Sequence, residues 1–250
     1  MVAGGLLVHG AGTMFEKRGQ HYAFRVDPAI ANNSHTKVIR MIGRGKRVLE
    51  VGCATGYVSA YLSQQMQCEV VGIELDPQMA KKAERYCSKV VVGDVEKDAF
   101  DKLAGVFDVI TFGDVLEHLV TPGEVLRKSR DYLGPDGYVL ISLPNVAHYR
   151  VRLALLQGRF DYEEQGILDR THLRFFTLRN ARRMIEDAGF EVQDFQIVYC
   201  TRGTRLVDWS LRIQRFLRDH LAELVGSEFI FKAGKRLEPD IENLRGRPNL

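Results

Sequence analysis

The chain has 250 residues, a formal net charge of +3 and a hydrophobic content of 45%. This length allows one large domain with a full hydrophobic core. The basic residues are dispersed and form no arm or stripe, which argues against nucleic acid and favours a small-molecule ligand. No apolar run approaches the ~20 residues of a membrane span, so we expect no membrane partner either.

Four cysteines lie far apart and form no C-x-x-C pair: Cys53, Cys68, Cys87 and Cys200. This pattern argues against a zinc site and favours a reducing compartment. The sequence therefore predicts no metal and a cytoplasmic location.

The two ends of the chain differ in composition from the rest. Residues 1–13 are glycine-rich and lack the basic front and long apolar centre of a secretory signal. We expect a flexible extension over residues 1–13, a folded domain over residues 14–236 and a polar tail over residues 237–250.

Helices and strands are predicted to alternate over the first half of the domain. Residues 33–42 suit a helix capped by Asn33 or Ser34 and ended by Gly43. The next predicted elements are strand 47–51, helix 57–65, strand 69–74, helix 77–87, strand 89–92, strand 107–112, helix 122–133 and strand 137–142. Continuous apolar strands are typical of sheets covered on both faces, so we predict an α/β fold with a parallel sheet.

Residues 143–175 break this alternation with glycines and many charged or aromatic side chains. A long irregular segment in a compact domain is more often a functional loop than a simple connection. We therefore expect a lid over a substrate site. Thr177 then caps a helix at 178–188, followed by strand 190–199, helix 205–225 and strand 228–235.

The most informative motif is the strand and turn at residues 48–56, Val-Leu-Glu-Val-Gly-Cys-Ala-Thr-Gly. A turn of small residues lets a cofactor approach the backbone closely. The dinucleotide fingerprint G-x-G-x-x-G would need glycines at 52, 54 and 57, but the chain has Gly52, Ala54 and Tyr57.

The following strands end in acidic residues in a recurring order: Glu74, Asp94 and Asp114. With the turn Leu-Gly-Pro-Asp-Gly at 133–137, residues 45–145 resemble class I S-adenosylmethionine (SAM) dependent methyltransferases, of the kind associated with sugar or natural-product biosynthesis. The resemblance implies a Rossmann-like, doubly wound, seven-stranded sheet with an antiparallel last strand, and SAM as the cofactor.

The resemblance also assigns roles to residues. Glu50 is expected near the amino group of the methionine part, Glu74 at the ribose hydroxyls and Asp94 at the adenine amine. The expected cofactor-binding set is Glu50, Gly52, Cys53, Ala54, Gly56, Glu74, Leu75, Asp94, Val95 and Asp114.

Two histidines are candidates for a general base. His172 follows Asp169 by three residues, a spacing that suits a base and the carboxylate that orients it. His118 lies four residues after Asp114 in the stretch expected near the reacting end of the cofactor. Each histidine serves equally well as a packing residue, so both roles stay open.

The sequence therefore favours SAM-dependent O-methylation of a small hydroxylated acceptor, such as a sugar or a secondary metabolite. Three alternatives remain: an N-methyltransferase for a small amine, an NAD-dependent dehydrogenase, and a non-catalytic SAM-binding partner of another enzyme. The sequence does not specify the oligomeric state.

Overall fold

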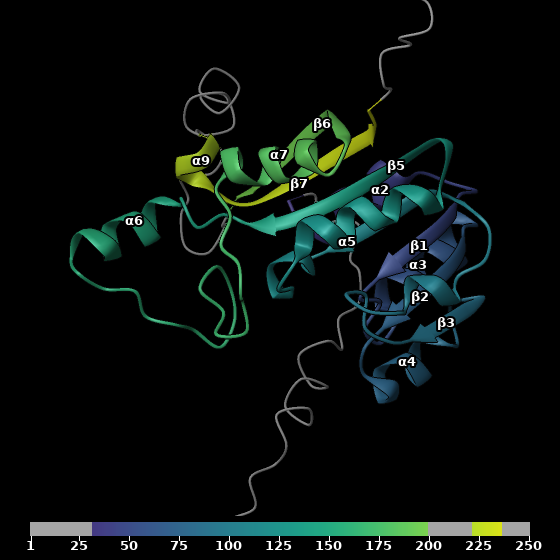
Figure 1. Ribbon diagram of the computed structural model, residues 1–250. Coiled ribbons are helices and arrows are strands. Elements are labelled where there is room, and N and C mark those ends of the chain that lie inside the picture. The colour runs from purple at the N-terminus through teal and green to yellow at the C-terminus, as the bar shows by residue number, and fades with distance from the viewer. Residues whose placement is uncertain (1–31, 200–221, 237–250) are drawn as a thin grey trace, which may run out of the picture.

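The computed structural model describes residues 32–199 and 222–236 (Figure 1). The predicted N-terminal extension, the predicted C-terminal tail and most of the predicted helix 205–225 lie outside these residues. In the described part, seven strands form one sheet in the order β3-β2-β1-β4-β5-β7-β6. The pairs among β1 to β5 are parallel, whereas β7 runs antiparallel to both of its neighbours. This confirms the predicted α/β sheet with an antiparallel last strand.

The strands are β1 Arg47–Val51, β2 Glu69–Glu74, β3 Lys89–Val92, β4 Phe107–Gly113, β5 Leu133–Pro144, β6 Phe190–Tyr199 and β7 Gly226–Lys235. The α-helices are α2 Ser34–Ile42, α3 Tyr57–Met66, α4 Pro77–Ala83, α5 Pro122–Ser129, α6 Tyr149–Leu156, α7 Leu178–Asp187 and α9 Ala222–Val225. Short 3-10 turns are η1 Phe100–Lys102, η2 Leu116–His118 and η3 Arg130–Tyr132. None of the helices between residues 32 and 236 that the structure describes is long and apolar enough to cross a membrane.

Helix starts follow the sequence signals closely. Asn33 caps α2 through its side chain, and Thr177 does the same for α7. Some ends differ from the prediction: α4 stops at Ala83, and α5 gives way to η3 at Arg130, so that β5 begins at Leu133.

Helix α6 lies inside the segment that we predicted to be irregular. It contains good helix formers, and the side chain of His148 caps its first turn. Only Val151 in this helix is buried, so the helix lacks the apolar stripe from which an amphipathic helix is recognised. The prediction of irregular structure was therefore wrong here.

The sheet separates two hydrophobic cores. On one face, Leu126 of α5 and Ile185 of α7 pack against strand residues such as Leu49. On the other face, α2 and α3 cover the alternate strand residues, among them Val48. Full burial of a Leu or Ile side chain contributes about 1.5–3 kcal/mol, so both helical layers stabilise the sheet.

Strand order reverses between β1 and β4, because β2 and β3 extend the sheet on one side and β5 on the other. Ligands of doubly wound sheets bind beyond the carboxyl ends of the strands at this switch point. Figure 1 shows α6 and the loop after it standing beyond the carboxyl end of β5. The segment predicted as a lid therefore lies at the ligand-binding edge.

Candidate functional site

The glycine turn after β1 forms the floor of the site. Gly52 and Gly56 have φ angles of 72° and 77°, in the left-handed region. A Cβ atom would lie 2.6 Å from the Val115 side chain at position 52 and 2.8 Å from the Cα of Ala83 at position 56. The turn therefore needs glycine at both positions, as the motif predicted.

Glu74 ends β2 beside this turn. One carboxylate oxygen accepts the N–H of Ala54 at 2.8 Å, and the other accepts the N–H of Asp76 at 2.9 Å. Each oxygen keeps a second lone pair for a further donor, such as a ribose hydroxyl. Asp76 itself caps α4 by accepting the N–H groups of residues 78 and 79. The structure thus separates the roles of the two acids.

Glu50 lies under the turn and is buried, with its carboxyl accepting from the Ser59 hydroxyl. Burial raises the pKa of Glu50 to about 8, against the opposing effect of the Ser59 hydrogen bond. A narrow cavity lies at the ends of β1 and β4, and Glu50 lines it together with His35 and Tyr57. Nε2 of His35 is 3.0 Å from the Tyr57 hydroxyl. This cavity suits a small cationic group facing Glu50.

Asp94 and Asp114 follow β3 and β4 at the same edge. The Asp94 carboxylate accepts the N–H of Glu96 at 2.9 Å and pairs with Lys97 at 3.2 Å. Asp114 has a φ of 53° and accepts from the Ser142 hydroxyl at 3.0 Å. Both acids are therefore held in place at the strand ends where the resemblance expects them.

The apolar residues of the expected set differ in exposure. Leu75 is exposed directly after β2, whereas Val95 is buried. Cys53 is also buried, and its sulfur lies 2.6 Å from the position of a Cβ built on Gly72. Its side chain therefore faces the sheet, and only its backbone is available to a cofactor. Ala54 completes the turn with a φ of 48°.

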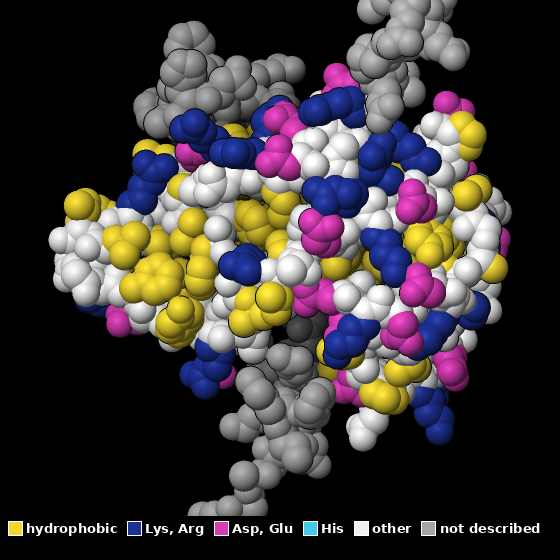
Figure 2. Space-filling view, viewed as in Figure 1, with side chains coloured by type: hydrophobic (Ala, Val, Ile, Leu, Met, Phe, Trp, Pro, Cys, Tyr) yellow, Lys and Arg dark blue, Asp and Glu magenta, His cyan; other side chains and the backbone are white. Residues whose placement is uncertain are grey.

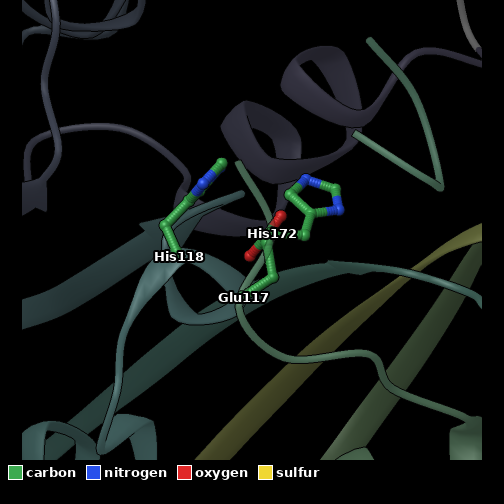
Figure 3. A group of neighbouring side chains, drawn as sticks. All are labelled: Glu117, His118 and His172. Atoms are coloured by element: carbon green, nitrogen blue, oxygen red, sulfur yellow. The ribbon is translucent and has the colours of Figure 1, made fainter. Parts of the chain in front are cut away.

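The two candidate histidines lie next to each other (Figure 3). Their ring centroids are 4.9 Å apart. The carbonyl of Glu117 in η2 accepts the N–H groups of Leu173 and Arg174 at 2.8 and 3.0 Å, which attaches the lid segment to η2. Burial, and then the neighbouring His172, lower the pKa of His118.

The Asp169 carboxylate does not contact the His172 ring. It accepts the backbone N–H of Thr171 at 2.8 Å and the Thr171 hydroxyl at 2.6 Å. A short Asp side chain commonly bonds the backbone two residues on, and this local bond takes precedence here. Nδ1 of His172 instead lies 3.2 Å from the Ile167 carbonyl. The pairing of Asp169 with the His172 ring was therefore wrong.

Asp169 orients the other histidine indirectly. Nδ1 of His118 is 3.2 Å from both the carbonyl and the hydroxyl oxygen of Thr171. Because the Thr171 hydroxyl donates its proton to Asp169, it accepts from His118, and Nδ1 of His118 carries the hydrogen. Nε2 of His118 is then the free nitrogen.

Glu117 is the residue of this site that the sequence reasoning missed. It is 1% exposed and lies within 4.8 Å of ligand atoms of both histidines. An acid inside the apolar run Val-Leu-Glu-His-Leu at 115–119 is the signal that would have found it.

A family model described as a methyltransferase domain matches residues 21–194. This range includes the glycine turn, the strand-end acids and both histidines. The chain belongs to this family of methyltransferase domains. This match confirms the expected class, a class I SAM-dependent methyltransferase, and the expected cofactor SAM. The alternative of an NAD-dependent dehydrogenase is excluded.

Named relatives of this methyltransferase are ubiquinone biosynthesis O-methyltransferases. The protein from Neisseria meningitidis serogroup C is 27% identical over 159 residues, which cover 60% of this chain and 66% of that protein. The protein from Psychrobacter arcticus is 30% identical over 171 residues, covering 64% of this chain and 65% of that protein. The chain thus spans just under two thirds of the length of these relatives.

Solved structures share the fold at low identity. A SAM-dependent methyltransferase from Archaeoglobus fulgidus matches with a TM-score of 0.60 and 18% identity, over 88% of this chain and 98% of that chain. Magnesium protoporphyrin IX methyltransferase from Synechocystis, solved with bound S-adenosylhomocysteine (SAH), matches with a TM-score of 0.59 and 16% identity, over 90% and 95%.

Proposed function

We propose that the domain transfers the methyl group of SAM to a hydroxyl oxygen of a small, largely apolar molecule. The carrying observation is the arrangement of the site. Glu50 and Glu74 flank the glycine turn, and Val115 packs against that turn at Gly52. The η2 turn that follows Val115 carries one imidazole of a neighbouring pair, and the lid segment carries the other. The names of the relatives support O-methylation, and nothing in the comparisons supports the sugar or secondary-metabolite acceptor that we expected.

The cofactor supplies an activated methyl group, so the protein mainly has to hold the acceptor in line and exclude water. We assign Glu74 to the ribose hydroxyls, Glu50 to the amino group of the methionine part and Asp94 to the adenine amine. Gly52 and Gly56 let the cofactor lie against the backbone.

The reacting oxygen must lose its proton as the C–O bond forms and the C–S bond breaks. A hydroxyl has a high intrinsic pKa, so a nearby group that takes this proton raises the rate. We place the reacting oxygen next to the pair formed by His118 and His172. An amine acceptor needs less help of this kind, which favours O-methylation over N-methylation at this site.

The lid segment favours an apolar acceptor. Phe160, Tyr162 and Phe175 form a group of rings with centroids 5.5–6.3 Å apart, and Leu153 and Leu156 are exposed on α6. Figure 2 shows hydrophobic side chains gathered at the end of the molecule that Figure 1 assigns to α6 and the loop after it. An apolar acceptor would bury this surface on closure of the lid.

A methyl-transfer assay with labelled SAM tests the proposal. The acceptors are apolar phenols and catechols, sugars, sugar nucleotides and small amines, and the site of the new methyl group is read by mass spectrometry. We expect labelled O-methyl product from an apolar hydroxylated acceptor. Label in amines alone would replace the proposal by N-methylation, and SAH binding without turnover on any acceptor would make the chain a SAM-binding partner protein.

The described cysteines Cys53, Cys68 and Cys87 are free thiols, which supports a reducing compartment. We therefore keep the cytoplasm as the proposed location.

A further inference from the structure

The proposed methyl transfer leaves the buried carboxyl of Glu117 unexplained. In the described part of the chain, neither of its oxygens has a hydrogen-bond partner. A buried carboxyl without partners is costly, so it needs either a proton or a cation beside it.

The two histidines next to Glu117 present suitable ligand atoms. Nδ1 of His118 faces the Thr171 carbonyl and Nδ1 of His172 faces the Ile167 carbonyl, each at 3.2 Å. Neither Nε2 atom has a hydrogen bond within the residues that the structure describes. Histidines that bind metals typically donate one ring N–H to a carbonyl and coordinate through the other nitrogen.

The geometry matches a metal site that needs only a small closure. One ligand atom from each of Glu117, His118 and His172 lies within 4.8 Å of the others (Figure 3). Ligands of a tetrahedral ion with bonds of about 2.0 Å lie about 3.3 Å apart. Side-chain rotations that move each ligand atom by about 1 Å would therefore bring the three atoms to the separation of a tetrahedral site.

The surroundings favour a cation. The carboxylates of Asp114 and Asp169 lie near enough to Glu117 to repel a negative charge there. Their combined field attracts a positive ion to the same place.

We propose that Glu117, His118 and His172 bind a divalent transition-metal ion, with Zn²⁺ as the first candidate. Two imidazoles and one carboxylate suit Zn²⁺ and related first-row ions, and catalytic sites of this kind have three protein ligands and an open position. The ion holds the acceptor oxygen at the open position and lowers the pKa of its hydroxyl. His172 is then a ligand and not a free base.

The catalytic part of this inference rests on the proposed function, whereas the binding of the ion does not. The sequence predicted no metal because its cysteine pattern excludes the common zinc motifs. The three ligands come instead from η2 and from the lid segment, which meet only in the fold.

A different assignment makes Glu117 a permanently protonated residue that holds the lid. Glu117→Gln separates the two, because glutamine imitates a protonated carboxyl in shape but is a poor ligand for Zn²⁺. The variant should behave as the wild type if Glu117 is only structural, and should lose the ion if it is a ligand.

The experiment uses the full chain, stripped with EDTA and dialysed. Zn²⁺ binding is measured by calorimetry, and Co²⁺ is added separately to read its visible absorption. Glu117→Gln and His172→Ala are compared with two matched controls outside the cluster. These are Glu124→Gln, at an exposed position, and His148→Asn, which keeps a capping side chain for α6. SAH affinity and the circular dichroism spectrum report on folding.

We expect one Zn²⁺ per chain in the wild type and both controls, with Co²⁺ bands typical of nitrogen and oxygen ligands. Glu117→Gln and His172→Ala should weaken Zn²⁺ binding by more than about 100-fold, beyond the 10- to 100-fold typical of an outer-shell partner. SAH affinity should stay within about threefold of wild type. Absence of stoichiometric binding, or equal Zn²⁺ affinity in wild type and Glu117→Gln, would overturn the site.

Activity distinguishes this inference from the proposed function. EDTA-stripped protein should bind SAH but transfer methyl groups slowly, and Zn²⁺ should restore the rate. Full turnover of stripped protein would remove the catalytic role of the ion while leaving O-methylation intact. Zn²⁺ binding without turnover on any acceptor would contradict the proposed O-methylation while leaving the metal site intact.

Discussion

Glu50→Gln is the substitution for which the structure gives the most detailed expectation. Glu50 is buried beneath the glycine turn, and burial raises its pKa to about 8. Glutamine preserves the size of the side chain and the acceptor for the Ser59 hydroxyl, but removes the titration. The substitution therefore isolates the charge that we assign to cofactor binding.

The effect on stability has a definite sign. The unfolded chain loses the Glu50 proton near pH 4.5, whereas the folded protein keeps it up to about pH 8. Between these values the folded state binds the extra proton, so the stability contributed by Glu50 is lost as the pH rises. The slope is about −1.4 kcal/mol per pH unit, or about 3 kcal/mol between pH 5.5 and pH 7.5.

The effect on cofactor affinity has the opposite sign. Pairing with the ammonium group of SAH requires the charged form of Glu50. The free-energy cost of deprotonating Glu50 decreases as the pH approaches 8. With a pKa of about 8 for the free protein, the Kd for SAH should fall about 50-fold between pH 6 and pH 8. Glu50→Gln should bind SAH weakly at both values and lose this dependence.

Urea unfolding followed by circular dichroism, at pH 5.5 and 7.5 without SAH, measures the first effect, and calorimetry measures the second. Glu84→Gln, at an exposed position, is the matched control. The difference in unfolding free energy between Glu50→Gln and wild type should shift by about 3 kcal/mol across this pH range. Parallel stability profiles of the two proteins would refute a buried, neutral Glu50.

Three further results are expected. Glu74→Ala should weaken SAH binding at least tenfold, about 1.4 kcal/mol, because the ribose loses a charged acceptor, whereas Asp76→Asn, which keeps the α4 cap, should stay near wild type in calorimetry. Hydrogen exchange over residues 144–175 should slow when acceptor and SAH are both bound, and protection limited to the sheet would contradict a lid. Gly56→Ala should cost more unfolding free energy than Gly45→Ala, for which about 1–2 kcal/mol is expected, because both glycines have positive φ but only position 56 meets the α4 backbone; equal losses would show that the close contact relaxes.

The parts of the site that the sequence predicted are those encoded by neighbouring residues. Glu50, Gly52 and Gly56 lie within one strand and turn, so their spacing defines the geometry directly. Glu74 was equally accessible because strand ends are readable from apolar runs. The number of strands and the antiparallel last strand followed from the family resemblance, since the alternation of elements alone indicates only a parallel sheet. The order of the strands came from the structure.

The lid segment was predicted less well because its contacts are not periodic. Helix α6 buries only Val151, so its pattern carries no helical signal. The spacing of Asp169 and His172 placed the two residues near each other, but spacing does not show where each side chain points. The carboxylate bonds within its own turn, and the histidine it orients is His118, through Thr171.

Glu50 and Glu117 share a physical property that links cofactor and acceptor binding. Both carboxyls are buried, and neither has a positively charged partner among the residues that the structure describes. An ammonium group at Glu50 and a metal ion at Glu117 would each convert a destabilising buried acid into a paired charge. On this reasoning, the free protein is less stable than its fold allows, and each cationic ligand recovers part of that stability by binding. The same desolvation that costs stability in the free protein therefore makes the site selective for positively charged groups.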